Sequence, residues 1–149
     1  MISLPKRIAM QKLRRHVSVL LLICISIGVS SARAQSPTRL SSTPKTFQSF
    51  YAKFRRAVIR GDKQAVASMT TFPFSYGWDA GDEGTYGRRQ FLQKFKDIFR
   101  GAASLFRRSD PKFTMDATSL VLTNTADASH YVFEKKHGIY HFASFIVEP

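Results

Sequence analysis

Three acidic residues in a glycine-rich segment are the first candidates for chemistry in this sequence. Asp79, Asp82 and Glu83 lie in a stretch that also holds four glycines between positions 77 and 87. Several carboxylate oxygens on a bent loop are the ligands that Ca²⁺ prefers. However, Gly81 stands where an EF-hand loop would carry a further Asp or Asn, and no Lys-Ser pair follows to form a nucleotide-binding loop. We therefore expect a solvated hairpin tip here.

The histidines do not show the spacing of a metal site. His137 and His141 are four residues apart, but the interval crosses a predicted turn and does not lie on one helix face. His130 and His141 are expected on the polar face of a sheet, where His141 can pair with Glu134 across strands. No further convergent ligand is evident, so we predict no metal site and no cofactor.

The first 34 residues have the parts of an export signal in the correct order. A basic start precedes an apolar run over residues 17–29, which would be about 20 Å long as a helix and too short for a hydrocarbon core of about 30 Å. Small residues then end at Ala34. We predict cleavage between Ala34 and Gln35, export to the periplasm or the medium, and no stable membrane anchor after cleavage. An uncleaved anchor is the alternative, and the export route stays open between general secretion and the twin-arginine pathway.

Cleavage would change what the composition implies about partners. It removes six of the 23 basic residues and the only cysteine, Cys24, so the mature chain has 17 basic and 10 acidic residues, a net charge of +7. The mature chain therefore has no disulfide and no thiolate metal site. Its basic residues fall mostly on the solvent faces of predicted helices, and we expect no nucleic-acid partner. The remaining positive charge favours anionic ligands.

The mature chain is predicted to form one domain over residues 46–149, after a flexible lead-in over residues 35–45 that is rich in Ser, Thr and Pro. All 13 phenylalanines follow Gln35. They can fill one core, because a chain of this length has room for one domain and not for two.

Apolar residues recur at steps of three and four from Phe47 to Val58, which indicates a helix with one buried face. Gly61 is then expected to end this helix in the left-handed conformation. Asp62 is expected to be the N-cap of a short second helix. A third helix is predicted from about Arg88, after a strand and a glycine-rich hairpin or loop.

The last third of the chain alternates apolar and polar residues over three runs, 113–123, 128–135 and 139–147, which predicts an antiparallel meander. A two-residue turn at His137 and Gly138 sets a register that pairs Lys136 with Ile139 and Tyr131 with Ser144. This register predicts one aromatic sheet face, made of Tyr131, Phe133, Tyr140, Phe142 and Ile146. It places Phe145 on the opposite, more polar face.

This order of elements resembles the NTF2-like superfamily, which includes the SnoaL-like and cystatin-like α+β cone proteins. The resemblance covers nearly the whole mature chain. It rests on the Gly61-Asp62-Lys63 junction, the Phe72-Pro73-Phe74 sheet entry, the Phe91 to Phe99 helix and the closing run from Phe133 through Gly138 to Val147. It implies an α+β fold in which three N-terminal helices pack on a curved antiparallel sheet, with a pocket between them. Homodimers formed through the sheet are frequent in this superfamily.

The resemblance also implies where a site would lie. Members similar to ketosteroid isomerase use an inward carboxylate as a base, and the candidates for that base here are Asp79 and Asp116. The candidates for lining a ligand pocket are aromatic: Phe74, Trp78, Tyr86, Tyr131, Phe133, Tyr140 and Phe142.

We therefore predict an exported domain that binds a small apolar or anionic ligand or a partner protein without catalysis. Two alternatives remain. One is an isomerase, hydrolase or cyclase that uses a pocket carboxylate, and the other is a dimeric interaction module with a filled cone. The fold alone does not choose among them, because one fold hosts many functions.

Overall fold

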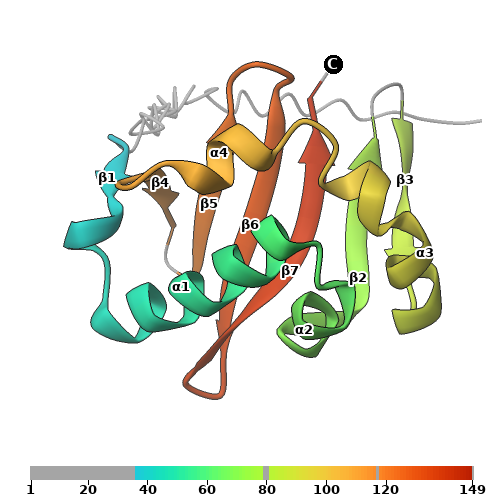
Figure 1. The fold of residues 1–149 in the computed structure, drawn as a ribbon, viewed down its shortest axis with the longest axis horizontal. Coiled ribbons are helices and arrows are strands. Elements are labelled where there is room, and N and C mark those ends of the chain that lie inside the picture. Colours follow the sequence, from blue (N-terminus) through green and yellow to red (C-terminus); the bar gives the residue numbers. More distant parts are fainter. Residues whose placement is uncertain (1–35, 79–80, 117, 149) are drawn as a thin grey trace, which may run out of the picture. The chain divides into compact units, whose positions relative to one another are not determined.

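The structure is a computed structural model that describes residues 36–78, 81–116 and 118–148 (Figure 1). The predicted leader, its cleavage site at Ala34 and Gln35, and Cys24 lie outside the described residues. The elements follow in this order: β1 (Thr38–Arg39), a 3₁₀ helix (Leu40–Ser42), α1 (Lys45–Arg60), α2 (Lys63–Ser68), β2 (Thr70–Trp78), β3 (Asp82–Tyr86), α3 (Arg88–Ile98), α4 (Ala103–Arg107), β4 (Lys112–Met115), β5 (Ser119–Asn124), β6 (Ser129–Lys136) and β7 (Ile139–Val147).

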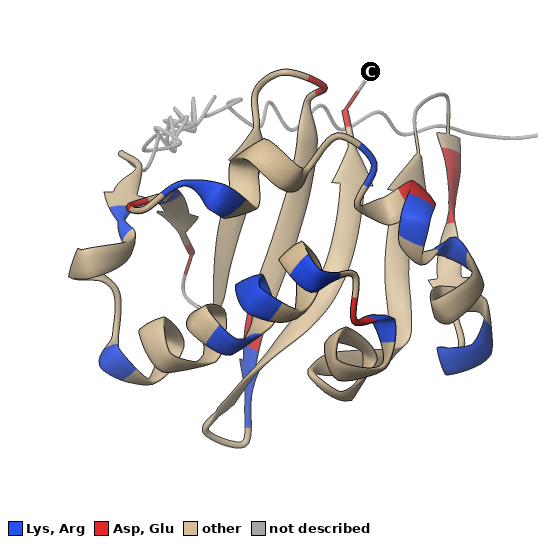
Figure 2. Cartoon of the chain, in the orientation of Figure 1, with Lys and Arg blue, Asp and Glu red and all other residues tan. Residues whose placement is uncertain are grey.

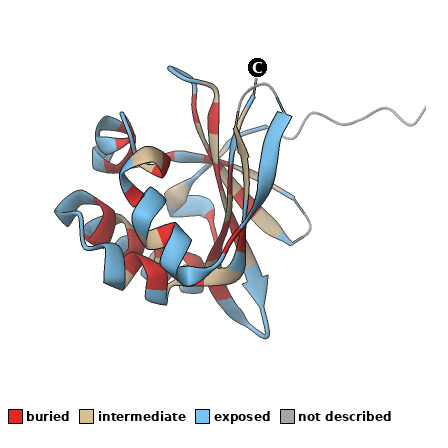
Figure 3. Cartoon of the chain, turned by 90° about the vertical axis from the view of Figure 1, so that its right-hand side faces the viewer, coloured by how far each residue is buried: buried red, intermediate tan, exposed pale blue. Residues whose placement is uncertain are grey.

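The strands form one sheet of seven strands in the order β1-β4-β5-β6-β7-β2-β3, and the helices cover one of its faces (Figures 1 and 3). The α+β class is therefore confirmed. Within the described ranges, no helix is long and apolar enough to cross a membrane.

Two details of the predicted architecture are wrong. The sheet is mixed and not antiparallel, because β2 pairs in parallel with β7. The meander from β4 to β7 crosses the sheet and its last strand meets β2 running in the same direction. The number of helices also differs from the three predicted. The β2–β3 hairpin separates α2 from α3, as expected, but a fourth helix, α4, follows a left-handed Gly101 with φ of 71°.

The predicted junction between the first two helices is confirmed. Gly61 ends α1 in the left-handed region with φ of 67°, where a side chain would be strained. Asp62 then caps α2, because its Oδ1 accepts a hydrogen bond from the backbone N–H of Ala65 at 3.0 Å. Phe47, Tyr51 and Phe54 lie on the buried face of α1, as the spacing predicts.

The lead-in is more ordered than its composition indicates. Residues 38–42 form β1 and the 3₁₀ helix, and Leu40 donates its N–H to the carbonyl of Pro111 at 2.9 Å. The Gln48 side chain on α1 also donates to the carbonyls of Ser41 and Thr43, at 3.2 and 2.7 Å. These partners are distant in sequence or on the next helix, so local composition does not predict them.

Aromatic rings fill the space between the helices and the sheet. Phe54 on α1 lies 5.1 Å from the ring centroids of both Phe133 and Phe142. On the other side, Phe142 lies 4.8 Å from Phe74. These side chains are fully buried, together with Phe47, Tyr51, Phe91, Phe106, Phe113 and Tyr131. The interior of the predicted cone is therefore packed and holds no open aromatic pocket among these rings.

A bulge in β7 changes the predicted register of the last hairpin. His137 and Gly138 form the turn, and Phe133 pairs with Phe142 as predicted. Ala143 is then an extra residue, so that Tyr131 pairs with Phe145 and not with Ser144. As a result Phe145 faces the core with 3% of its surface exposed. Ile146 turns outward with 41% exposed, the reverse of the prediction.

Candidate functional site

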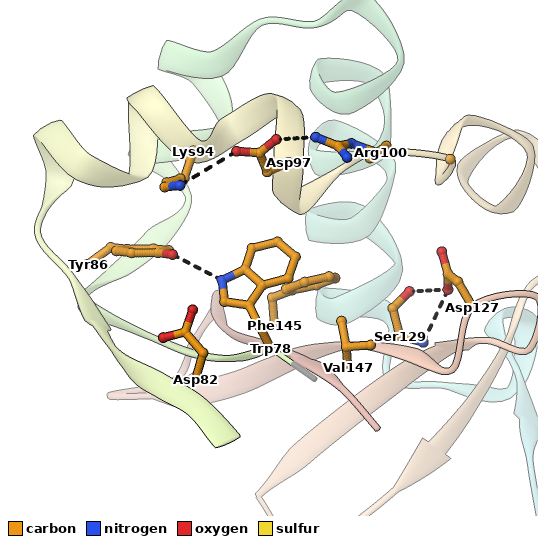
Figure 4. Close-up of a pocket in the computed structure, with 11 residues that line it drawn as sticks. Trp78, Asp82, Tyr86, Lys94, Asp97, Arg100, Asp127, Ser129, Phe145 and Val147 are labelled. Carbon is orange, nitrogen blue, oxygen red and sulfur yellow. Dashed lines mark hydrogen bonds and ion pairs between the residues drawn. The ribbon is translucent and has the colours of Figure 1, made fainter. Parts of the chain in front are cut away.

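An open cleft of about 600 Å³ lies where the ends of β2 and β7 meet α3 and the turn before β6 (Figure 4). We call it the Trp78 cleft. Its apolar floor is formed by Trp78 and Phe145, and Tyr86 stands at one side. Three carboxylates and two cations surround this floor: Asp82, Asp97, Asp127, Lys94 and Arg100.

The aromatic part of the cleft is fixed by ring contacts and one hydrogen bond. The indole of Trp78 meets Phe145 edge to face, with centroids 4.9 Å apart. Its Nε1–H donates to the hydroxyl oxygen of Tyr86 at 3.1 Å. The Tyr86 ring in turn stacks on Tyr76 at 4.0 Å. Phe74, Tyr76 and Trp78 alternate along β2, and their exposure grows from the buried Phe74 to the half-buried Trp78 at the strand end.

The cations of the cleft are neutralised in part by one carboxylate. Asp97 on α3 accepts from Arg100 at 2.6 Å and lies 3.8 Å from the ammonium group of Lys94. Asp127 forms a turn with Ser129, whose N–H and hydroxyl donate to its Oδ1 at 3.2 and 2.6 Å. Asp82 lies on the other side of the aromatic floor (Figure 4). The lining therefore has one more negative charge than positive charges.

The structure divides the predicted pocket residues into three groups. Trp78 and Tyr86 line the Trp78 cleft, and Tyr140 lines a second groove at the β6–β7 turn. The other four are core residues: Phe74, Tyr131, Phe133 and Phe142. Tyr131 donates its hydroxyl to the carbonyl of Ile98 at 3.1 Å, and burial raises the pKa of Tyr131 above its ordinary range.

The predicted base candidates lie apart from this cleft or outside the described residues. Asp116 is exposed at the turn between β4 and β5, where its N–H donates to the carbonyl of Ser119 at 2.9 Å. Asp79 lies outside the described residues. Every carboxylate side chain that the structure describes belongs to a residue that is exposed or half-buried. A ketosteroid isomerase type of base would need a carboxylate held in an apolar pocket.

The histidines have partners on the sheet or lie in a turn. His130 Nδ1 lies 3.0 Å from the hydroxyl of Thr123, and its Nε2 lies 3.2 Å from a carboxylate oxygen of Glu148. His141 lies opposite Glu134, as predicted, and the Glu134 carboxylate lies 3.8 Å from Lys136. No group of three His, Cys, Asp or Glu side chains in the described ranges is placed to hold a metal ion.

Sequence reasoning missed most of the lining of the cleft. Phe145 was expected on the opposite face, because the bulge at Ala143 leaves no signal in the alternation pattern. The basic residues of the predicted helices were expected mostly on solvent faces, and Lys94 and Arg100 are exposed. Their convergence with Asp127 depends on how α3 and the β5–β6 turn approach each other. The spacing of residues along the chain does not predict a tertiary contact of this kind.

No family model matches the sequence, and no curated protein matches it significantly. Among solved structures it is similar to the protein Aln2 from a Streptomyces species, with 15% identity, a TM-score of 0.38 and coverage of 69% of this chain and 87% of that one. It is also similar to a protein of unknown function with a cystatin-like fold from Nostoc punctiforme, with 14% identity, a TM-score of 0.39 and coverage of 70% and 90%.

In fold, the chain is similar to NTF2-like and cystatin-like proteins. A domain from Xanthomonas campestris described as a calcium/calmodulin dependent protein kinase II association domain is a third example, with 13% identity, a TM-score of 0.38 and coverage of 69% and 86%. At such low identities these similarities concern the fold and say nothing about a ligand of this chain.

Proposed function

We propose that this domain, exported and freed of its leader, is a non-catalytic binding protein that holds a small aromatic ligand in the Trp78 cleft. The observation that carries the proposal is the pair of Trp78 and Phe145, which forms an aromatic floor in an open cleft. Sites for small molecules combine such apolar surfaces with a few placed polar groups. A ligand ring would stack on the half-buried indole, whose orientation the hydrogen bond to Tyr86 fixes.

The filled interior directs the ligand to this cleft. Phe54, Phe133 and Phe142 occupy the space in which a cone pocket was expected. Opening that space would require these rings to leave a packed core, at a cost of several kcal/mol in each case. The cleft needs no such rearrangement, because it is already open and the half-buried Trp78 is accessible in it.

The charges of the cleft favour a neutral or cationic ligand over an anionic one. Asp97 already pairs with both Lys94 and Arg100, so Asp82 and Asp127 leave the lining net negative. A cation placed over an exposed indole gains about 0.5–1 kcal/mol in addition. For this cleft we therefore set aside the anionic ligand that the overall charge of the chain favours.

The position of the carboxylates supports binding over catalysis. The side chain of Asp97 is 37% exposed, and both cations of the cleft contact it, so it lacks the apolar surroundings of a pocket base. Asp127 is tied to Ser129 by two hydrogen bonds. An enzyme that uses a pocket carboxylate stays the alternative, and turnover of a substrate abolished by Asp82→Asn would favour it.

The filled interior also favours a second candidate function, a dimeric interaction module. The outward face of the sheet carries Ile146, which the bulge at Ala143 turns toward solvent with 41% of its surface exposed. Two copies could pair through this face. Native mass spectrometry of the exported protein would report a dimer, and Ile146→Ser would then shift it to a monomer.

Three probes of equal size test the charge preference of the Trp78 cleft. Benzylamine, benzyl alcohol and benzoate share one ring and differ in charge, and their binding to the exported protein can be followed by NMR of the Trp78 indole N–H. We expect affinity to fall in the order amine, alcohol, benzoate. Asp82→Asn with Asp127→Asn should remove the advantage of the amine, whereas the exposed Asp110→Asn should not. Equal affinities, or the reverse order, would refute the proposed ligand class.

A further inference from the structure

A second groove, of about 580 Å³, lies at the other end of β6 and β7, beside the tip of their hairpin. It runs between the first half of α1, the end of α2 and the turn at His137 and Gly138. Figure 1 shows this hairpin tip at the opposite end of the sheet from the β5–β6 turn that borders the Trp78 cleft. The two sites therefore share no residue and can be tested separately.

The groove has an apolar surface that extends into solvent. Phe50 and Tyr140 lie at its base, with ring centroids 6.3 Å apart. Tyr140 is 7% exposed, whereas Ile139 at the hairpin tip is 62% exposed. Met69 adds a flexible apolar side chain. A ligand with an apolar body would cover Ile139, which nothing in the described part of the chain covers.

The charged residues of this groove are all cations. Lys45, Ser49 and Lys53 line it from α1 at steps of four residues, so they form one stripe along the helix. Each step advances about 6 Å along the axis, so Ser49 lies between the two lysines on the helix. The ammonium group of Lys45 donates to the side-chain oxygen of Gln48 at 3.5 Å. Lys135 does not line the groove, but its Nζ lies 5.6 Å from the centroid of the Tyr140 ring, which does.

One acidic residue of the hairpin, Glu134, is close to the groove but does not line it. It lies opposite His141, which does line the groove. The Glu134 carboxylate lies 3.8 Å from the ammonium group of Lys136, which offsets its charge. Figure 2 shows Lys and Arg along α1 and on β6 near the hairpin turn, with an acidic segment next to them on β6. The lining of the groove itself includes no Asp or Glu among the described residues.

We infer that this groove binds a small amphiphilic anion, with a single carboxylate or sulfonate head beside Ser49 and an alkyl or aryl body on Phe50, Ile139 and Tyr140. Lys45 and Lys53 attract the head from both sides, and Ser49 can donate a hydrogen bond to it. The apolar body gains by covering the exposed Ile139. The opposite charges of the two sites give them opposite preferences, so the anionic ligand belongs here and not in the Trp78 cleft. This inference does not depend on the proposed function.

Sodium octanoate is the test probe. Octylamine has a chain of the same length and the opposite charge, and it is the control ligand. Binding to the exported protein is followed by NMR of the backbone amides of Ser49, Gly138 and Ile139. We expect octanoate to shift these amides in a saturable manner and to leave the fluorescence of Trp78 unchanged. The double variant Lys45→Gln, Lys53→Gln should weaken octanoate binding about tenfold, since two exposed ion pairs are lost.

The matched control removes the same charge elsewhere. Lys96→Gln with Lys112→Gln alters two exposed lysines outside the groove, so octanoate affinity should stay within about twofold. Ile139→Ser should weaken binding without lowering stability, because its side chain is mostly exposed. Three results would overturn the inference. Octylamine could bind as tightly as octanoate, the control variant could lose as much octanoate affinity as the Lys45 and Lys53 variant, or the amide shifts caused by octanoate could map to the Trp78 cleft.

Discussion

Trp78 and Tyr86 are joined by a hydrogen bond from the indole Nε1–H to the phenol oxygen at 3.1 Å, across the two strands of the β2–β3 hairpin. The bond uses the polar edge of each ring and leaves the apolar faces available. Tyr86 is held in turn by its stack on Tyr76 at 4.0 Å. The hairpin thus presents one oriented indole to the cleft, and this orientation is the basis of the proposed ligand binding.

Replacing Phe54 by Ala should lower the free energy of unfolding by about 3 to 5 kcal/mol. Phe54 is fully buried, and the cavity left behind would border Phe133 and Phe142, which cannot both close it. Urea denaturation of the variant measures the loss. Ile59→Ala, on the exposed side of α1, is the control and should change stability little. A loss under about 1 kcal/mol for Phe54→Ala would mean that α1 packs on a different face.

Replacing Asp62 by Ala should cost about 0.5 to 2 kcal/mol of unfolding free energy. The change removes the acceptor for the N–H of Ala65 at the start of α2. Asp62→Asn keeps a side-chain oxygen at that position and should recover most of the loss. If the Ala and Asn variants were equally unstable, the capping hydrogen bond would not be the source of the effect.

The protein should lose stability at alkaline pH through two buried tyrosines. Burial raises the pKa of Tyr51 and of Tyr131 above the ordinary value of about 10. The folded state thus favours the neutral phenols. Their contribution is complete below the unfolded pKa and is lost as the pH rises through the folded pKa. Ultraviolet absorbance should show both phenols ionising only together with unfolding, and ionisation in the folded protein would contradict their burial.

The exported protein should begin at Gln35. Signal peptidase cleaves after small residues, and Ala32 and Ala34 supply them. Intact-mass analysis of protein from the exported fraction measures the N-terminus. Ala34→Arg should leave the leader attached, whereas Ser36→Arg, beyond the cleavage site, should not. A native mass that includes the leader would show that the chain is not processed as proposed.

The sequence predicts the elements of this fold better than it predicts their contacts. The spacing from Phe47 to Val58 and the Gly61 and Asp62 signals are local, and both are confirmed. The parallel pairing of β2 with β7 and the bulge at Ala143 depend on distant partners, and the prediction misses both.

The site follows the same division between local and distant signals. Trp78 and Tyr86 were candidates for lining a pocket inside the cone, and the structure places them in an open cleft at the ends of the strands. Phe145 was not among the candidates, because the predicted register of β7 lacked the bulge at Ala143 and placed Phe145 on the other face of the sheet. Tyr131 and Phe133 were expected to line a pocket, but they fill the core, because alternation gives the face of a strand and not whether that face is covered.

The fluorescence of Trp78 gives the most direct test of the proposed binding site. It is the only tryptophan in the chain, so excitation at wavelengths that tyrosine does not absorb reports on the cleft alone. Titration of the exported protein with benzylamine should give a saturable change in emission. Phe145→Leu should weaken the affinity, while Ile59→Ala should not. A change that does not saturate, or equal affinity in the Phe145→Leu protein, would contradict ligand binding on the floor of Trp78 and Phe145.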